Sequence, residues 1–504
     1  MLKRLVGFAL FFALILAAFP AVAQFETPLI IFYGHQLWTP DESSNSLIPF
    51  SACPVAADEP IVWRPDGSLA LSPDGTQLAY TIQPAMVTEA IERFGGFGGG
   101  ELPSSIVLCD LQTGVVTTVG GQPENAAFFD LAGGDSNTMH SLPAWSPDGT
   151  QLAWTQFSNP DLDEGRMTIM RYDLASGQTT QIAQLPPQYG VPVTVALDWS
   201  DAGILLRNQQ FVPPPAGADP MLTPVNDTLD ILDPSTGELH TIYTVNYEAI
   251  GEAYLEEYFW VKTEQGWQVV LSMSNNSWTL IDPATGNAAP LAGVLTYSIP
   301  DTLSRIATPI MQDFGGILYR WLDISSPDQP PVAIGYETAG RLTPPALSLS
   351  ALYAFPTADN SAIMWAPPGS QSPLPLPTVD NPYTPAEVVW GAGAVWGLLP
   401  PEAAPDLSSF IPTQASTCPD SMPARLTIGA QGYVSDDLAN NVRSEPSTAG
   451  DLLGQIPAGS VFTVLEGPVC EDDLVWWRVS TETVTGWTAE GMDGEYWLSP
   501  LDVG

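Results

Sequence analysis

The feature that most constrains the fold of this chain is a repeat that runs through most of its length. A first phrase, LSPDGTQLAYT from Leu71, returns as WSPDGTQLAWTQ from Trp145 and in weaker form from Leu197 and Ile299. A second phrase is an apolar segment that ends in a tight turn, as in IVLCDLQTG and MTIMRYDLASG. The turn aspartates of its five copies are Asp110, Asp173, Asp233, Asp282 and Asp323. They are spaced 63, 60, 49 and 41 residues apart, which approaches the period of repeat architectures built from four-stranded units.

The residue types within the two phrases predict turns between β-strands. In S-P-D-G the proline presets φ, the aspartate caps its own turn and the glycine accepts a positive φ. The residues that follow, such as Leu152 and Trp154, are suited to an inner strand. In D-x-x-[ST]-G, Asp173 and Gly177 bracket a second reversal. Each unit is therefore predicted to be a four-stranded antiparallel sheet whose faces are buried only when neighbouring units stack.

Over about residues 60–399 these phrases resemble the blades of TolB-like and WD40-like bacterial β-propellers. The resemblance implies an all-β ring of seven blades, or six, and nothing about activity, because propellers serve scaffolding, recognition and catalysis alike. One blade is expected to form from both ends of the ring, through PLIIFYGHQLWTP and the segment EVVWGAGAVWGLL from Glu387. A further, degenerate unit is expected around ALYAFPTADNSAIMWAPPGS.

A helix is expected to interrupt the first unit, in the segment PAMVTEAIERFGGFGGGELP. Val87, Ile91 and Phe94 fall at helical spacing, and the glycines from Gly95 to Gly100 then predict a flexible surface tip. A phosphate-binding loop is the weaker interpretation, because neither G-x-G-x-x-G nor the lysine of a P-loop is present.

The C-terminal part of the chain predicts a second, smaller domain. Residues 400–417 are rich in proline and predict a spacer, and residues 418–504 follow as a separate unit. About residues 424–498 resemble the bacterial SH3-like (SH3b) domain, a small β-barrel whose members bind cell-wall peptides or glycans, or partner proteins. The positions that carry this resemblance are Asn441, Val442, Arg443, Pro446, Gly454, Ile456, Pro457, Gly459, Trp477, Val479, Gly486 and Trp487.

Aromatic residues of this domain are candidates for a binding surface. Strand alternation puts Trp476 and Trp477 on opposite faces, which predicts that at most one of them lies in the core. We expect Trp477 and Trp487 to pack inside the barrel, which leaves Trp476 and Tyr496 as the binding candidates. A third candidate is His140, which precedes the second S-P-D-G phrase and is considered for the mouth of the propeller channel. The alternative, more usual for an isolated histidine, is a hydrogen-bonded packing residue.

The N-terminal sequence predicts export. Lys3 and Arg4 precede an apolar run that ends at Pro20 and the small-residue site Ala21 to Ala23, the layout of a cleaved signal peptide over residues 1–23. The propeller would then occupy residues 24–399 of a secreted or cell-envelope protein. The alternative is an uncleaved membrane anchor. No second apolar run of spanning length follows, so no membrane span is expected after cleavage.

Four cysteines in an exported chain predict two disulfides. Cys418 and Cys470 both fall in the C-terminal unit, which leaves Cys53 and Cys109 as the N-terminal pair. A zinc site is improbable, because the cysteines are far apart, form no C-x-x-C motif and are accompanied by only three histidines. No metal or other cofactor is therefore predicted.

The charge of the chain excludes one class of partner. With 14 basic and 56 acidic residues the formal net charge is -42, which repels nucleic acid phosphates. The acidic surface serves solubility or, alternatively, binds cations, although the D-x-[DN]-x-[DN]-G pattern of an EF-hand is absent.

The motifs favour a binding protein over an enzyme. The G-x-S-x-G nucleophile motif of α/β-hydrolases does not occur. A glycosidase would need two carboxylates that converge in the channel, which 56 acidic residues neither exclude nor assign. We therefore predict a non-enzymatic recognition or scaffold protein whose partner is a cell-wall peptide or glycan, or an envelope protein. The alternative is an extracellular propeller hydrolase or lyase that acts on polysaccharide.

Overall fold

The computed structural model describes most of the chain between Thr27 and Leu501. The described residues are 27–41, 43–44, 46–64, 67–94, 103–124, 126, 137–158, 166–185, 195–212, 223–247, 255–273, 277–299, 305–311, 317–323, 332–333, 346–347, 353–356, 362–365, 374–377, 386–391, 393–400, 424–426, 431–434, 439–472, 474–481, 484–492 and 495–501. The predicted signal peptide and the predicted spacer at 400–417, apart from Pro400, lie outside them.

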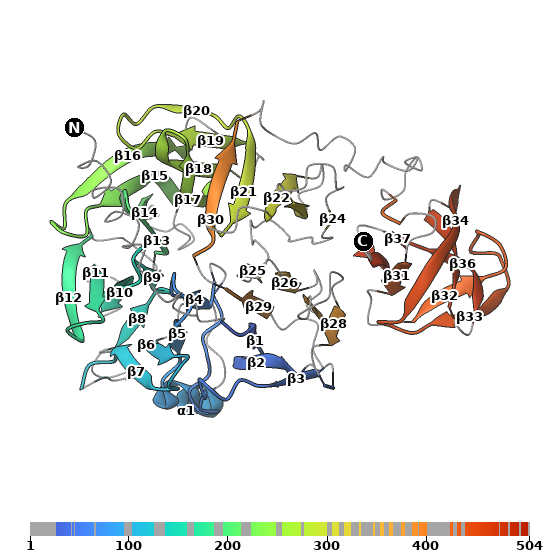
Figure 1. Ribbon diagram of the computed structural model, residues 1–504, viewed down its shortest axis with the longest axis horizontal. Coiled ribbons are helices and arrows are strands. Elements are labelled where there is room, and N and C mark those ends of the chain that lie inside the picture. Colours follow the sequence, from blue (N-terminus) through green and yellow to red (C-terminus); the bar gives the residue numbers. More distant parts are fainter. Residues whose placement is uncertain are drawn as a thin grey trace, which may run out of the picture.

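Antiparallel sheets arranged as a ring make up the first part of the chain (Figure 1). The first sheet joins β29 (Ala386–Val389), β1 (Ile30–Tyr33), β2 (Gln36–Asp41) and β3 (Ser46–Pro49). The second contains β4 (Leu69–Leu71), β5 (Gln77–Ile82), β6 (Ser105–Asp110) and β7 (Val116–Gly120). The third contains β8 (Thr138–His140), β9 (Ala144–Trp145), β10 (Gln151–Ser158), β11 (Arg166–Asp173) and β12 (Gln178–Gln184).

Three more sheets complete the ring. One contains β13 (Leu197–Ser200), β14 (Gly203–Val212), β15 (Thr223–Leu232) and β16 (Leu239–Asn246). Another contains β25 (Ala346–Leu347), β26 (Tyr353–Pro356), β27 (Ala362–Trp365) and β28 (Leu374–Pro377). The last has nine strands: β17 (Leu255–Thr263), β18 (Gly266–Met273), β19 (Trp278–Ile281), β20 (Ala288–Pro290), β21 (Val294–Ser298), β22 (Arg305–Met311), β23 (Ile317–Asp323), β24 (Val332–Ala333) and β30 (Val395–Leu399).

The predicted closure of the ring by both of its ends is confirmed for β29, the first strand of the segment from Glu387. The second strand of that segment, β30, was expected in the same blade but lies in the nine-stranded sheet. Strand β29 pairs with β1 in antiparallel register, from Ile30 opposite Val389 to Tyr33 opposite Ala386. The first strands of neighbouring sheets also touch one another, since β29 contacts β4, β4 contacts β9, β9 contacts β13 and β13 contacts β17. These strands form the inner wall of the ring, and the pairing of β1 with β29 covers an edge that would otherwise be open to aggregation.

The predicted count of seven or six blades is wrong. Strand β30 pairs with β21 along five residues and meets β17 where Lys262 lies opposite Gly397. It therefore merges the meanders β17–β20 and β21–β24 into one continuous sheet. Within the described residues the ring has five separate blades and this nine-stranded sheet. The sequence indicated a strand here, but not that it would insert between two meanders.

The repeated turns form as their residue types predict. In the second S-P-D-G copy, Asp148 accepts hydrogen bonds from the Ser146 hydroxyl at 2.6 Å and from the Thr150 backbone at 3.1 Å. Gly149 between them has a φ of 70°, where other residues are strained. In the D-x-x-[ST]-G turns the glycine N–H donates to the aspartate carbonyl, as from Gly177 to Asp173 at 2.8 Å.

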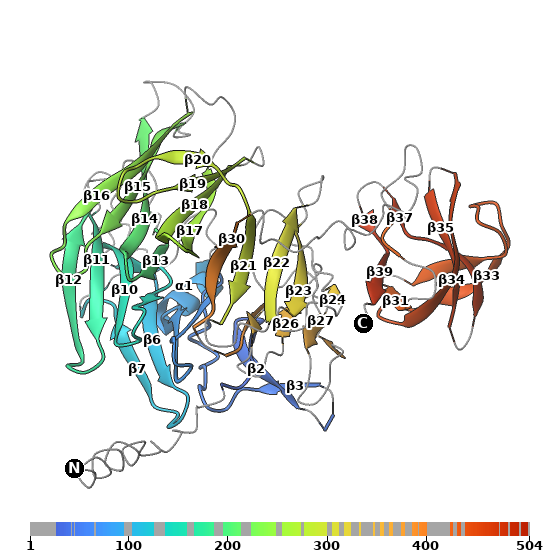
Figure 2. The same ribbon diagram turned by 45° about the horizontal axis from the view of Figure 1, so that its top comes forward.

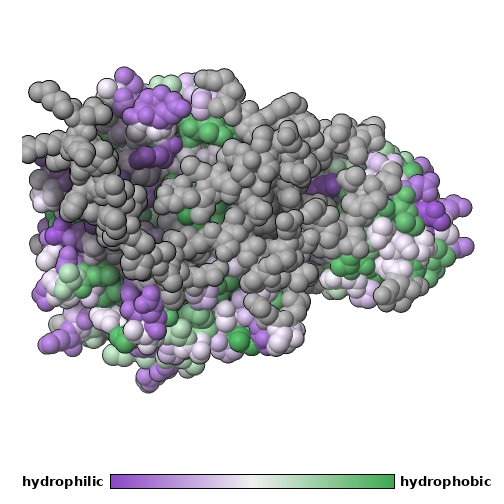
Figure 3. Space-filling model, viewed as in Figure 1, coloured by the Kyte–Doolittle hydropathy of each residue, from purple (hydrophilic) through white to green (hydrophobic). Residues whose placement is uncertain are grey.

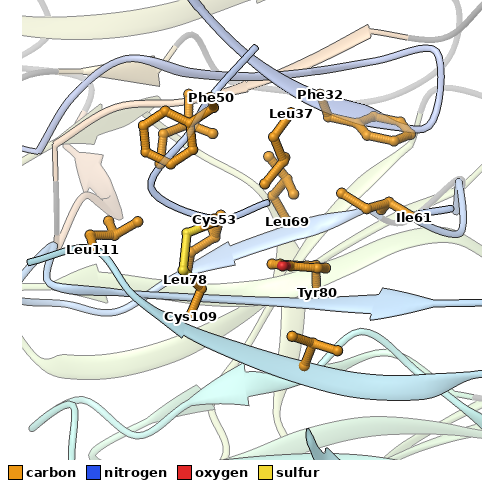
Figure 4. Packing of buried hydrophobic residues seen from close by; sticks show 12 residues of the cluster. Phe32, Leu37, Phe50, Cys53, Ile61, Leu69, Leu78, Tyr80, Cys109 and Leu111 are labelled. Atoms are coloured by element: carbon orange, nitrogen blue, oxygen red, sulfur yellow. A yellow bond between two sulfur atoms is a disulfide. The ribbon is translucent and has the colours of Figure 1, made fainter. Parts of the chain in front are cut away.

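The predicted helix and the N-terminal disulfide are both confirmed. Helix α1 (Ala85–Phe94) lies between β5 and β6, and Val87 on it is fully buried. Cys53 and Cys109 are bonded within a core cluster that includes Phe32, Leu78 and Tyr80 (Figure 4). The bond therefore links the segment that follows β3 to β6 of the second sheet. The other predicted pair stays a prediction: Cys470 is disulfide-bonded, but Cys418 lies outside the described residues.

The C-terminal part is a second β-rich unit (Figure 2). Its main sheet has seven strands: β31 (Gln431–Val434), β32 (Asn440–Arg443), β33 (Leu452–Ile456), β34 (Val461–Glu471), β35 (Leu474–Ser480), β36 (Thr485–Ala489) and β39 (Leu498–Leu501). Two short strands, β37 (Gly491–Met492) and β38 (Glu495–Tyr496), pair separately. Among the described helical residues there is no stretch long and apolar enough to cross a membrane.

Candidate functional site

The two faces of the ring differ in the length of the chain segments on them. Successive connections of an antiparallel meander lie alternately on opposite faces. One face therefore carries the short repeat turns, such as 146–150 and 174–177, and we call it the turn face. At the other, which we call the loop face, β5, β7, β10, β12, β14 and β16 end, and seven or more residues separate each of these ends from the next strand. Because a rigid scaffold commonly presents its function on such loops, the loop face is the better candidate for contact with a partner.

His140 does not lie at an exposed channel mouth but is a hydrogen-bonded packing residue, the other of the two roles considered for it. Its side chain is fully buried, and its Nδ1 lies 2.6 Å from the carbonyl oxygen of Ser104. Burial lowers the pKa of His140 to about 4, so the imidazole is neutral at physiological pH. A side chain so enclosed supports the packing between β8 and its neighbours and offers no surface to a ligand.

Four side chains gather on neighbouring strands of the inner wall, and we call them the inner-wall cluster: Asp198 on β13, Phe259 on β17, Tyr297 on β21 and Trp396 on β30. The ring centroids of Tyr297 and Trp396 are 5.0 Å apart, and those of Phe259 and Trp396 are 5.2 Å apart. Tyr297 and Trp396 lie directly opposite each other across the pair β21 and β30. Asp198, Tyr297 and Trp396 are half-buried and keep accessible surface.

The carboxylate of Asp198 is held at the contact between two sheets. Its Oδ2 accepts a 2.8 Å hydrogen bond from the backbone N–H of Trp260, and the Trp260 indole donates back to the Asp198 carbonyl at 3.2 Å. Burial raises the pKa of Asp198 to about 6, and hydrogen bonds from the backbone of Trp260 and Trp199 only partly oppose this rise. Burial and the nearby Asp198 charge together raise the pKa of Tyr297 to about 12. The inner-wall cluster thus combines a neutral phenol with a carboxyl group that titrates near neutral pH.

Sequence reasoning missed this cluster, although the repeat contained a signal for it. Asp198 occupies the position that Ala70 and Ala144 take directly before the two clear copies of the first phrase. An acidic residue at an inner-strand position where the repeat has alanine is a departure that packing alone does not require. Tyr297 and Trp396 lie in segments without a clear repeat, so their approach to Asp198 could not be anticipated.

A second polar group lies between the fourth sheet and the nine-stranded sheet. Arg207 Nη2 lies 2.5 Å from Asp227 Oδ2, and the Tyr247 hydroxyl donates a short hydrogen bond to the same oxygen. Tyr247 also accepts a 3.3 Å hydrogen bond from the backbone N–H of Leu255, the first residue of β17. Asp227 is fully buried, so this group connects the two sheets and does not form an open site.

The expectation that Trp476 is exposed is wrong, because both tryptophans of the pair are buried. Trp477 packs in the barrel core and is 1% exposed, as predicted. Trp476 points to the opposite face, but there it packs with Trp487 and Trp497 in a second small cluster and is 2% exposed. The two side chains therefore do point to opposite faces of β35. The sequence did not reveal that Trp487 and Trp497 cover the outer face. Trp487 is half-buried at the edge of this second cluster.

Tyr496 is half-buried, and the guanidinium group of Arg425 lies over its ring. The guanidinium carbon of Arg425 lies 3.2 Å from the centroid of the Tyr496 ring. Arg425 also donates to the Leu498 carbonyl at 3.0 Å. A ligand-binding role of Tyr496 stays a prediction, and in this arrangement its ring face is occupied by Arg425.

Exposed large apolar side chains of the described C-terminal unit lie on three strands, one of which is β37 with Met492. Leu452 and Leu453 on the edge strand β33 are 57% and 52% exposed, and Val461 and Leu465 on β34 are also exposed. Apolar residues are visible among hydrophilic ones on the face of this unit drawn in Figure 3. Exposed apolar side chains on an edge strand are typical of sites where another chain docks.

The described residues contain no group of three or more histidine, cysteine, aspartate or glutamate side chains that could hold a metal ion. The inner-wall cluster has one carboxylate and no thiol or imidazole, which is a poor ligand set for zinc. What the cluster can offer a bound group is aromatic surface, one hydrogen-bond acceptor and a negative charge.

Comparison with known protein families identifies the C-terminal unit. Residues 436–492 match the family described as bacterial SH3 domain. The chain is thus a propeller-like protein that carries a C-terminal bacterial SH3 domain. No curated protein sequence matches it significantly.

Solved structures with a similar arrangement belong to proteins of several kinds. TolB from Acinetobacter baumannii is 14% identical, with a TM-score of 0.33, over 65% of this chain and 81% of TolB. An oligogalacturonate lyase from Vibrio parahaemolyticus is 13% identical, with a TM-score of 0.35, over 73% of this chain and 85% of the lyase. Dipeptidyl peptidase 4 from Porphyromonas gingivalis is 10% identical, with a TM-score of 0.30, over 69% of this chain and 48% of the peptidase. These similarities assign no activity to the chain.

Proposed function

We propose that the protein is an extracytoplasmic recognition protein in which the C-terminal domain tethers the chain to the cell wall and the propeller binds a partner. The observation that carries this proposal is the combination in one chain of a propeller-like ring and a bacterial SH3 domain at 436–492. Members of the SH3b family commonly bind cell-wall peptides or glycans. The Cys53 to Cys109 disulfide is compatible with an oxidising compartment.

The shape of the ring supports a binding role for the propeller. At the loop face, seven or more residues separate successive strands of the second, third and fourth sheets, whereas the turn face repeats the same two short turns. Rigid sheets with variable loops on one side are the usual arrangement of a recognition scaffold. We therefore place the partner at the loop face or at the inner wall that opens onto it.

One observation favours the alternative, a hydrolase or lyase acting on polysaccharide. Asp198 has a pKa of about 6, which suits a general acid or base near neutral pH. A glycosidase, however, uses two carboxyl groups about 5 to 10 Å apart. Among the described residues no second carboxylate contributes to the pKa shift of Asp198, which is caused by burial and opposed by backbone hydrogen bonds. Recognition is therefore the function that the cluster supports better.

Co-sedimentation with purified peptidoglycan tests the tethering role. The full chain is expected to pellet with the peptidoglycan, and a variant with Leu452→Ser and Leu453→Ser is expected to pellet less, because it loses exposed apolar surface of β33. Val115→Ser and Val116→Ser, which alter exposed apolar residues of the ring, form the matched control and should pellet like the parent. A full chain that stays in the supernatant would contradict the tethering role.

Incubation with polysaccharides tests the alternative. The proposal predicts no increase in reducing ends or in the ultraviolet absorbance of unsaturated products. Product formation that Asp198→Asn abolishes would establish the enzyme instead.

A further inference from the structure

The inner-wall cluster contains a carboxylate that lacks a cationic partner within the described structure. Among the residues that the structure describes, the hydrogen bonds that act on the Asp198 carboxylate come from the backbone of Trp260 and Trp199, and no lysine or arginine contributes to its electrostatics. The lysine of the adjacent strand, Lys262, is turned elsewhere, because its Nζ lies 4.6 Å from the centroid of the Trp267 ring. A desolvated carboxyl group of this kind gains most from a cation brought by a ligand.

The aromatic part of the cluster favours the same kind of ligand. Trp396 lies between Phe259 and Tyr297, with centroid distances of 5.2 and 5.0 Å, and the rings are tilted by 36° and 55°. Tilted rings from three strands present faces in more than one direction, and ring faces attract cations. Tyr297 contributes no positive or negative charge of its own at neutral pH, because its pKa is about 12.

We propose that the inner-wall cluster binds the protonated amine or guanidinium group of a lysine or arginine side chain that a partner protein inserts into the ring. This inference rests on the proposed function and adds the chemistry of the recognised group. The cation would lie against Trp396 and Tyr297 and pair with Asp198. The net charge of -42 favours the approach of a basic partner, since an acidic protein attracts cations over a distance set by the salt concentration.

Ligand-detected NMR on the full chain tests the proposal with two small probes. Nα-acetyl-lysine amide carries the ammonium group, and Nα-acetyl-norleucine amide is its uncharged analogue. We expect saturation transfer to the lysine probe and little to the norleucine probe. Asp198→Asn should weaken the binding of the lysine probe about tenfold, because the variant lacks the negative charge. The asparagine oxygen still accepts the hydrogen bond from the Trp260 N–H.

Two further variants keep the test decisive. Asp201→Asn, an exposed aspartate three residues after Asp198, is the matched control and should bind the lysine probe like the parent. Trp396→Leu should weaken the binding of the lysine probe. The near-ultraviolet circular dichroism spectrum of this variant should still be that of a folded protein. If that variant does not fold, the comparison of Asp198→Asn with Asp201→Asn alone decides the question.

Three results would overturn the inference: equal transfer to both probes, undiminished binding by Asp198→Asn, or transfer to methyl glucoside in place of the lysine probe. The last result would assign the aromatic rings to a glycan. A chain that pellets with peptidoglycan but ignores the lysine probe overturns only this inference, whereas a chain that fails to pellet overturns the tethering role.

Discussion

The indole nitrogen of Trp477 donates a 2.7 Å hydrogen bond to Oε2 of Glu490, a carboxylate that is 1% exposed. The other oxygen, Oε1, accepts a 2.7 Å hydrogen bond from the backbone N–H of Arg425. Burial raises the pKa of Glu490, and the Trp477 and Arg425 hydrogen bonds oppose that rise. This one side chain therefore fixes the segment 424–426 onto the core of the SH3-like unit.

Glu490→Ala should lower the free energy of unfolding of the C-terminal unit by about 3 kcal/mol, because it leaves the Trp477 indole and the Arg425 backbone N–H buried without an acceptor. Urea unfolding of the full chain, followed by tryptophan fluorescence, measures the change. Glu466→Ala is the control, since its 3.5 Å contact with Arg478 is exposed and surface ion pairs contribute less than about 1 kcal/mol. Equal losses in the two variants would contradict the assigned role of Glu490.

The stability of the ring should depend on the protonation of Asp198. Its pKa in the folded protein is about 6, above the ordinary value of 3.8, so the folded state holds this proton more tightly than the unfolded state. The contribution of Asp198 is therefore most favourable below pH 3.8 and is lost as the pH rises through about 6. The asparagine of Asp198→Asn does not titrate. The melting temperature of this variant minus that of the parent should therefore be higher at pH 8 than at pH 4.5. A difference between the two proteins that does not change with pH would contradict this prediction.

The turn aspartates should make the protein less stable as the pH falls, which is opposite to the effect of Asp198 and occurs at lower pH. Hydrogen bonds from Ser146 and Thr150 lower the pKa of Asp148 below 3.8. Its stabilising contribution is thus complete above that value and is lost as the pH falls through the folded-state pKa. Asp148→Ala should lower the free energy of unfolding by about 1 kcal/mol at pH 7, and by less at pH 3. Asp58→Ala, at an exposed position outside the repeat, serves as the control. If it lowers the free energy of unfolding as much as Asp148→Ala does, the hydrogen bonds of the turn are not the cause.

Removal of the N-terminal disulfide should destabilise the ring by about 4 kcal/mol, the chain-entropy value for a loop closed across a separation of 56 residues. The double variant Cys53→Ala and Cys109→Ala can be compared with the parent by thermal unfolding, with and without reductant. Reductant should lower the melting temperature of the parent more than that of the variant. An unchanged melting temperature in the variant would contradict a stabilising role.

The sequence predicted those parts of the fold that depend on local chemistry. The turns at Asp148 and Asp173 formed as expected because the aspartate and glycine of each phrase, together with the proline of the first, determine the backbone locally. The pairing of β1 with β29 was predictable because two unpaired strand segments remained at the ends of the repeat. Helix α1 followed from apolar residues at helical spacing.

The parts that depend on contacts between distant segments were not predictable. The insertion of β30 between β17 and β21 depends on pairing between residues more than ninety positions apart, for which no local signal exists. Trp476 is covered by Trp497, a residue from another turn of the barrel, so strand alternation alone gave the wrong exposure. The binding candidates chosen by residue type, Trp476 and His140, are both buried, whereas Asp198 was marked only by its departure from the repeat.

Site-specific photo-crosslinking tests most directly the claim that the loop face is where this protein meets its partner. A photoreactive residue would replace Met86, which is 60% exposed on α1 in the loop-face connection 83–104, or Ala175, which is exposed in the turn-face connection 174–177. The account predicts crosslinks to an envelope component from position 86 and none from position 175. Equal crosslinking from both positions, or crosslinking from position 175 alone, would contradict it.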